Sequence, residues 1–259
     1  MMRLKMKGYG GSLYRVNAIV VKAYSFGEND RIVTLFTDRL GIIQAIAKGA
    51  RKIKSHLLSA TVPFSEGSYL LYKGRSLYTI TQFDFEETHN KIARDMECLT
   101  CAEYLVELSM KVGTEYTDDR LYMLFKDGLK YLDNGIGEPE LLVYAFSLWI
   151  MKLNGLKPNL ISCTQCYSSV DDGIWFSAEA GGVLCSKCHL NYADSFRIDR
   201  STISVCRYME EHQFSFLSHL NILKRTRVEI DKVIKSLIRY YIDPDIRTLE
   251  LLSTGEYTL

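Results

Sequence analysis

Long apolar runs are absent from the 259-residue sequence. The longest candidates, near residues 18–21 and 141–151, are short or interrupted, whereas a membrane-spanning helix needs about 20 apolar residues. The opening stretch MMRLKMKGYGGS is basic, but no apolar segment follows it, which disfavours a secretory signal peptide. We therefore expect a cytoplasmic protein, associated with the nucleoid if it binds DNA, and no membrane partner.

Signatures of the common catalytic sites are also missing. The sequence has no GxxxxGK[ST] phosphate-binding loop and no HExxH zinc motif, and none of its five histidines begins the HxE motif of zinc deaminases. The glycines at 8–11 precede a predicted strand rather than following one, so they do not form a dinucleotide site. No Ser-His-Asp set can be assigned. The sequence therefore indicates none of these catalytic classes.

The distribution of charge points to an anionic partner. The net charge is only +1, but residues 1–85 carry thirteen Lys or Arg and five Asp or Glu, a net charge of +8. The remainder carries 19 basic and 26 acidic residues, a net charge of −7. A basic first third joined to a mildly acidic body predicts that an anion docks on the first third.

Two patterns of secondary structure follow one another along the chain. Residues 14–85 are rich in Val, Ile, Tyr, Phe and Thr between turn signals, which predicts five strands at 14–25, 31–37, 41–47, 62–72 and 77–83. Five strands in about seventy residues fit a small barrel of the OB or SH3-like kind. Helical periodicity then predicts helices at 89–112, 118–132, 139–153, 201–212 and 223–241. We expect an α+β multidomain protein, with a barrel domain at 1–85 and a helical domain at 86–259.

Four of the seven cysteines form one motif. Cys163, Cys166, Cys185 and Cys188 have the spacing Cys-x2-Cys-x18-Cys-x2-Cys, which lies within the range of zinc sites built from two knuckles. Gly and Asp residues between the pairs predict the hairpin that would bring them together. We expect one structural Zn²⁺ in an insert at about 160–190, with His189 a neighbour of the site. Two metal-free dithiol pairs are the alternative. Cys98, Cys101 and Cys206 fit the apolar core better.

A cluster of cations follows the third predicted strand. The segment AKGARKIKSH at 47–56 predicts an exposed loop whose charges neutralise phosphates, although a solvated loop without a ligand is the alternative. The candidate phosphate contacts in this region are Lys22, Arg31, Arg39, Lys48, Arg51, Lys52, Lys54 and Arg75. Candidate rings for base stacking are Tyr24, Phe26, Phe36 and Tyr69, each of which could equally belong to the core.

The run GENDRIVTLFTDRLGIIQAIAKGARKIKS at 27–55 resembles the start of the RecO family of bacterial DNA-repair proteins. The helical body with its CTQC…GGVLCSKC insert is similar to that family too, and the resemblance covers nearly the whole chain. It implies an N-terminal OB domain, a helical zinc-bearing domain and a non-enzymatic recombination mediator. Such a mediator binds single- and double-stranded DNA, anneals complementary strands and works with RecR to load RecA onto DNA covered by single-stranded-DNA-binding protein.

Two other functions remain open on the sequence alone. One is a protein-interaction scaffold that docks through a zinc ribbon. The other is a dithiol redox protein, although the sequence has two Cys-x-x-Cys pairs in an insert and no βαβ pattern. For docking of the single-stranded-DNA-binding protein, Lys224, Arg225 and Arg227 are the candidate cations.

Overall fold

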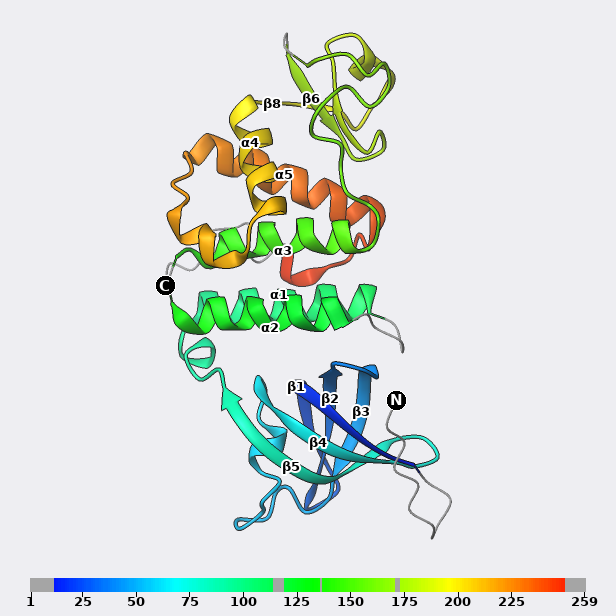
Figure 1. Cartoon of the computed structure of the whole chain (residues 1–259), viewed down its shortest axis with the longest axis vertical. Coiled ribbons are helices and arrows are strands. Elements are labelled where there is room, and N and C mark those ends of the chain that lie inside the picture. The colour runs from blue at the N-terminus through cyan, green and yellow to red at the C-terminus, as the bar shows by residue number, and fades with distance from the viewer. Residues whose placement is uncertain (1–11, 114–118, 136, 171–172, 250–259) are drawn as a thin grey trace. The chain divides into compact units, whose positions relative to one another are not determined.

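A computed structural model of the chain describes residues 12–113, 119–135, 137–170 and 173–249 (Figure 1). These residues form two compact units, one drawn from residues 1–93 and 113–133 and the other from residues 94–112 and 134–259. The chain therefore leaves the first unit, enters the second with one helix, and returns to the first with the next helix. The sequence analysis placed one continuous domain before residue 85 and another after it, and that division stays a prediction.

The first unit is built on a closed five-stranded barrel. Its strands are β1 (Leu13–Phe26), β2 (Asp30–Thr37), β3 (Gly41–Ala47), β4 (Ser65–Lys73) and β5 (Tyr78–Thr88). They close in the order β1-β2-β3-β5-β4, with β3 and β5 parallel and the other neighbours antiparallel. This is the OB-type arrangement, so the structure confirms the OB alternative of the sequence analysis.

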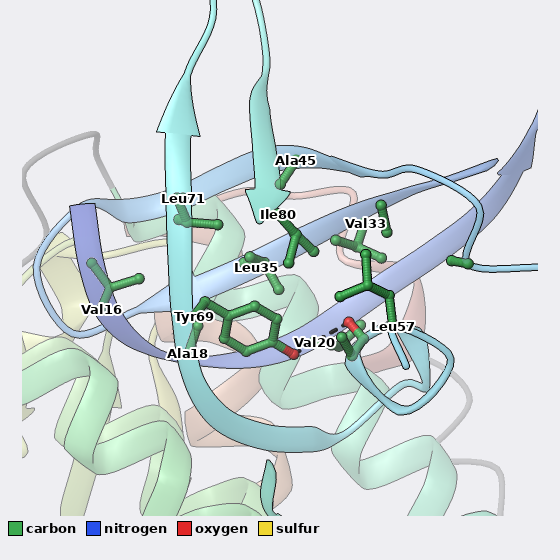
Figure 2. Packing of buried hydrophobic residues seen from close by; sticks show 13 residues of the cluster. Val16, Ala18, Val20, Val33, Leu35, Ala45, Leu57, Tyr69, Leu71 and Ile80 are labelled. Atoms are coloured by element: carbon green, nitrogen blue, oxygen red, sulfur yellow. Dashed lines mark hydrogen bonds between the residues drawn. The ribbon is translucent and has the colours of Figure 1, made fainter. Parts of the chain in front are cut away.

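Alternating side chains of the strands fill the barrel. Ala18 and Val20 of β1 and Val33 and Leu35 of β2 point inward in Figure 2, at the period of two that a strand imposes. The ring of Tyr69 lies among them, and its hydroxyl donates a hydrogen bond to the carbonyl oxygen of Ala60 at 3.2 Å. The one buried phenol of this core is thereby satisfied, which burial requires.

Helix α2 (Asp119–Asn134) covers part of the outer surface of this barrel. Phe36 alternates with the inward-facing Leu35, so its ring points outward from β2, where it meets the helix. The Phe36 ring centroid is 5.2 Å from that of Phe125 and 5.8 Å from that of Tyr122. All three rings are buried. The amphipathic face of α2 is therefore an integral part of the first unit.

We expect Phe125→Ala to lower the free energy of unfolding of the first unit by about 3–5 kcal/mol, because it leaves a cavity between α2 and β2. Met123→Ala on the exposed side of the same helix is the control and should change it by less than about 1 kcal/mol. Urea unfolding followed by circular dichroism measures both. Equal effects of the two substitutions would contradict the packing described here.

The second unit is a helical cluster around α3 (Pro139–Leu153). Helices α1 (Met96–Val112), α4 (Arg200–Glu211) and α5 (Lys224–Tyr241) pack on it. Residues 141–148, 150 and 151 of α3 are all buried, as expected of a helix that is apolar on every side. This segment is the longest apolar run noted in the sequence. Within the described residues, no helix is long and apolar enough to cross a membrane.

The cysteine insert contributes a small sheet to the second unit. Strands β6 (Ile174–Ser177), β7 (Gly182–Leu184) and β8 (Phe196–Ile198) form it in the order β7-β6-β8. Short 3₁₀ turns complete the second unit: η3 (Cys188–Asn191) in the insert and η4 (Phe214–His219) before α5. Turn η1 (Ser59–Thr61) belongs to the first unit, and η2 (Ile92–Arg94) spans the division between Ala93 and Arg94.

Three predicted boundaries were wrong by three or more residues. The strand expected to end at residue 83 ends at Thr88. The helix expected from residue 89 begins at Met96, because β5 runs on to Thr88 and Asp95 caps the helix by accepting a hydrogen bond from the backbone N–H of Cys98 at 2.9 Å. The strand expected from residue 62 begins at Ser65, because η1 and the positive φ of Phe64 (62°) delay it. Residue 118, the expected start of α2, lies outside the described residues.

Candidate functional site

The four predicted cysteine ligands converge at one point. The Sγ atoms of Cys163, Cys166, Cys185 and Cys188 all lie within 4.8 Å of one another, and those of Cys166 and Cys185 are 3.8 Å apart. A tetrahedron of sulfurs around Zn²⁺, with bonds of about 2.3 Å, has edges of about 3.8 Å. The donor set and its dimensions therefore suit a metal ion of the tetrahedral, thiolate-binding kind.

Tight backbone turns hold each pair of cysteines. The N–H of Tyr167 donates to the carbonyl oxygen of Cys163 at 2.9 Å, and the φ of Tyr167 is 61°. The N–H of His189 donates to the carbonyl oxygen of Cys185 at 3.2 Å. Each turn aims two sulfurs at the same side, which is the geometry that a Cys-x-x-Cys knuckle needs.

A close backbone contact brings the two knuckles together. Asn159 pairs with the β6–β7 hairpin by accepting from the N–H of Val183 and donating to Gly181, both at 2.9 Å. A Cβ on Gly182 would lie 2.2 Å from the carbonyl oxygen of Asn159. Only glycine fits there, so the second glycine of the GGVLC sequence is required for the first knuckle to dock on the second.

The protonation of the cluster favours a cation. The backbone N–H groups of Cys188 and Lys187 lower the pKa of Cys185 to about 6, and hydrogen bonds from Ser168 lower the pKa of Cys166. The pKa of Cys188 is raised to about 12, because the sulfurs of Cys185 and Cys166 accept its proton. A metal ion at the centre would take the place of that shared proton.

His189 and the remaining cysteines lie outside this ligand set. The imidazole of His189 stacks on the indole of Trp175, with ring centroids 3.6 Å apart and an interplanar angle of 0°. Cys101 and Cys206 are buried in the helical core, where burial raises the pKa of both thiols. The prediction of core residues is confirmed for these two cysteines, whereas Cys98 is only half-buried.

Four of the predicted basic residues gather on one loop. Lys48, Arg51, Lys52 and Lys54 are exposed on the segment that follows β3. This segment is tied to the β1–β2 turn by three hydrogen bonds: from the N–H of Gly49 to the carboxylate of Asp30 (2.8 Å), from the N–H of Arg51 to the carbonyl of Asn29 (3.0 Å), and from the guanidinium of Arg51 to the carbonyl of Gly27 (3.2 Å). We call residues 48–54 the basic loop.

The lysines of the basic loop form no ion pair within the described barrel. The ion pairs of Lys and Arg there join Arg15 to Asp84 and Arg39 to Asp38, and join Glu66 and Glu87 to Lys126 and Lys130 of α2. Among the described residues, Lys48, Lys52 and Lys54 therefore present uncompensated charge to solvent. Such charge attracts an anionic partner and releases its counterions on binding.

Arg31 has a different position from the loop cations. It is half-buried at the start of β2, opposite Ala47 of β3, and its guanidinium donates to the hydroxyl (3.1 Å) and carbonyl (3.4 Å) oxygens of Thr61. Arg31 therefore connects the barrel to η1 as well as adding charge near the basic loop.

The other predicted cations lie elsewhere on the barrel. Arg39 is in the β2–β3 turn, at the opposite end of these two strands from the basic loop. Arg75 is exposed between β4 and β5, and Lys22 is exposed on β1. In OB barrels the oligonucleotide face lies over β2 and β3 between the β1–β2 and β4–β5 loops, so Lys22 and Arg75 border that face.

Two of the four predicted stacking rings cannot contact a ligand. Phe36 and Tyr69 are fully buried, Phe36 beneath α2 and Tyr69 inside the barrel, so that part of the prediction was wrong. Tyr24 and Phe26 are 47% and 50% exposed. Lys22, Tyr24 and Phe26 occupy every second position of β1, and Phe26 lies opposite Asp30 beside the β1–β2 turn. Both rings are therefore available next to the basic loop.

The expected cations of the second unit are mostly paired internally. Arg227 forms ion pairs with Glu138 and Glu140, and Arg225 forms them with Asp199 and Glu229. Lys224 is exposed. These pairs explain why the sequence, which shows the cations but not their tertiary partners, overstated this group.

Two family models together match most of the chain. The family "Recombination protein O N terminal" matches residues 12–89, and "Recombination protein O C terminal" matches residues 93–250. The chain belongs to the RecO family.

Curated RecO proteins match over most of their length. "DNA repair protein RecO" of Alkaliphilus metalliredigens is 34% identical over 232 residues, which cover 89% of this chain and 94% of that protein. "DNA repair protein RecO" of Acetivibrio thermocellus is 30% identical over 241 residues, covering 93% and 96%. The RecO resemblance drawn from residues 27–55 and the cysteine insert is thereby confirmed.

We expect Cys188→Ser to lower the metal content of the purified chain, because it removes one of four converging sulfurs. Cys98→Ser, outside the cluster, is the control and should leave the content unchanged. Elemental analysis measures the metal, and Trp175 fluorescence reports the surroundings of the cluster through its stacking on His189. Equal metal content in the two variants would rule out the cluster as the binding site.

Proposed function

We propose that this chain is a recombination mediator that binds single- and double-stranded DNA through the barrel of its first unit. The RecO family is one of DNA-repair proteins, and a mediator role in repair is what membership supports. The finer steps are our proposal: annealing of complementary strands and, with RecR, loading of RecA onto DNA covered by single-stranded-DNA-binding protein. The observation that carries it is the uncompensated charge of the basic loop beside two exposed rings.

The physical role of the loop is to neutralise phosphates. Lys48, Lys52 and Lys54 would release counterions from one DNA strand, which supplies affinity with little dependence on sequence. Neutralising one strand lowers its repulsion for a complementary strand, so base pairing can begin. No covalent bond is made or broken, and the proposed function needs no catalytic residue. We expect this work to take place in the cytoplasm, at the nucleoid.

The remaining predicted contacts divide by position. Lys22 and Arg75 would line the strand path over the OB face, and Arg51 and Arg31 would add charge while fixing the turn and η1. Arg39, at the other end of β2 and β3, would contact DNA only where the strand extends past the barrel. Tyr24 and Phe26 would stack on bases, which is favourable for any base.

We propose that the four-cysteine cluster holds one structural Zn²⁺. Four thiolates complete a tetrahedron and leave no open position, so the ion would brace the β6–β7 hairpin and take no part in chemistry. The convergence of all four sulfurs disfavours a redox role for either pair, since a dithiol enzyme needs one accessible pair.

A protein-docking role of the ribbon is a second candidate function. Tyr167 and Leu190 flank the cysteine knuckles and are each 78% exposed. Apolar side chains exposed beside a rigid metal site are typical of partner contacts. RecR and single-stranded-DNA-binding protein are the partners that the RecO family leads us to expect, and binding of either to the ribbon would be compatible with DNA binding by the barrel.

We expect the triple variant Lys48→Ala/Lys52→Ala/Lys54→Ala to weaken binding to single-stranded oligonucleotides of every sequence and to reduce the salt dependence of binding. The slope of log K against log salt should fall by about one per lost phosphate contact. Fluorescence anisotropy at several salt concentrations measures this.

The matched control for the triple variant removes the same charge from the second unit. Arg94→Ala/Arg207→Ala/Lys224→Ala takes away three exposed cations there and should leave the slope unchanged. If the two triple variants lose affinity equally, net charge rather than the basic loop governs binding, and the proposed site is wrong.

We expect Phe26→Ala to weaken single-strand binding by about 1–3 kcal/mol without changing the salt slope, because it removes a stacking surface and no charge. Phe85→Ala, which removes an equally exposed ring from β5 opposite Gly67 of β4, is the control. Anisotropy with an oligothymidine checks both variants. No loss of affinity for Phe26→Ala would place the bases elsewhere.

A further inference from the structure

A second group of metal-ligating side chains lies in the first unit, outside both sites described above. Glu66 is on β4, Glu87 is the residue before the last of β5, and His89 follows Thr88, the end of that strand. One ligand atom from each of the three lies within 4.8 Å of the others. Glu66 and Glu87 are directly opposite in the β4–β5 ladder, and the N–H of His89 extends the ladder to Phe64 at 3.3 Å. The backbone therefore fixes all three positions.

Two buried atoms of this group face each other without a hydrogen bond. Glu66 is 0% exposed and His89 is 3% exposed. Oε2 of Glu66 and Nε2 of His89 are 4.0 Å apart, too far for a hydrogen bond, and neither has a partner among the described residues. Burying two polar atoms without hydrogen bonds costs free energy, which favours a species that binds between them.

One oxygen of the Glu66 carboxylate is already engaged, because Oε1 accepts from Nζ of Lys126 on α2. Nδ1 of His89 lies 3.9 Å from the carboxylate of Asp133, which is beyond hydrogen-bond distance, and that carboxylate accepts from the N–H of Lys91. Oε2 is therefore the atom of Glu66 left to face His89.

The charges around the gap favour a cation over a water as the species that fills it. The charged groups around the gap are Glu66, Glu86, Glu87 and Asp133 against Lys126 and Lys130, so acidic groups outnumber basic ones by two. A divalent cation would neutralise the group, whereas a water would leave the charge in place.

We propose that Glu66, Glu87 and His89 bind one divalent transition-metal ion, Zn²⁺ or an ion of similar preference. One imidazole nitrogen and two carboxylates suit such an ion, and a solvent molecule would complete its coordination. The ion would cross-link β4 to the end of β5 and, through the contact of Glu66 with Lys126, to α2. Its role is to hold α2 on the barrel at the point where the chain leaves β5.

The test is a calorimetric titration of ZnCl₂ into the full-length chain whose four-cysteine cluster already carries one equivalent of Zn²⁺. We expect a second binding event of one ion per chain. Glu87→Gln should weaken it at least about tenfold, and His89→Gln should abolish it. Glu87 is exposed, so its substitution leaves the buried core intact even if the His89 variant folds poorly.

Glu86→Gln is the matched control, because it removes the same charge from the adjacent exposed residue, which is outside the ligand set. It should shift the affinity by less than about twofold. A single zinc per chain in the unaltered protein, or equal effects of Glu86→Gln and Glu87→Gln, would overturn the proposal.

The ¹⁵N chemical shifts of the His89 ring identify what fills the gap. A metal-bound Nε2 supports the cation. A protonated Nε2 in the presence of excess Zn²⁺ would show that a water or a proton bridges the pair, and would overturn the site.

Discussion

The hydrogen bond from the N–H of Gly49 to the carboxylate of Asp30 is the contact on which the candidate DNA surface depends. It fixes the segment after β3 against the β1–β2 turn, and Gly49 meets it with a positive φ of 67°. Two further hydrogen bonds, from Arg51 to Asn29 and Gly27, complete the attachment of the basic loop to this turn. Asp30 and Gly49 come from the two halves of the run that resembles RecO, so this run encodes one structural unit rather than two separate motifs.

The barrel of the first unit and the ribbon of the second differ in how much core their strands can bury. The barrel closes on itself and leaves no free edge, with Tyr69 and the aliphatic residues as its core and α2 as a cover. The ribbon of the second unit has three strands of three or four residues, too little to bury a core of its own. A metal ion bound by the four converging cysteines would supply the constraint that packing cannot, which would account for the concentration of cysteines in so short a stretch.

Features that depend on neighbouring residues in the sequence could be predicted from it. The succession of strands and helices, a small five-stranded barrel and the cysteine cluster follow from period, turn chemistry and ligand spacing, whereas the choice of the OB over the SH3-like kind came from the family resemblance. The burial of Phe36 and Tyr69 could not be predicted in this way, because an aromatic residue in a strand is exposed or buried depending on what covers it. Helix α2, which covers Phe36, lies more than eighty residues beyond it in the sequence. The Glu66–His89 group was missed for the same reason. Its members are scattered in sequence and meet only because β4 and β5 pair and α2 returns to the barrel.

Helix α3 is enclosed on every side, and this has a consequence for how the second unit opens. Its backbone amides should exchange with deuterated solvent only when the unit unfolds as a whole, whereas the short ribbon strands can exchange through local fluctuations. The same enclosure means that unfolding exposes an apolar segment of more than ten residues at once. Partly opened chains would therefore self-associate through α3, and the order in which elements detach governs solubility as well as stability.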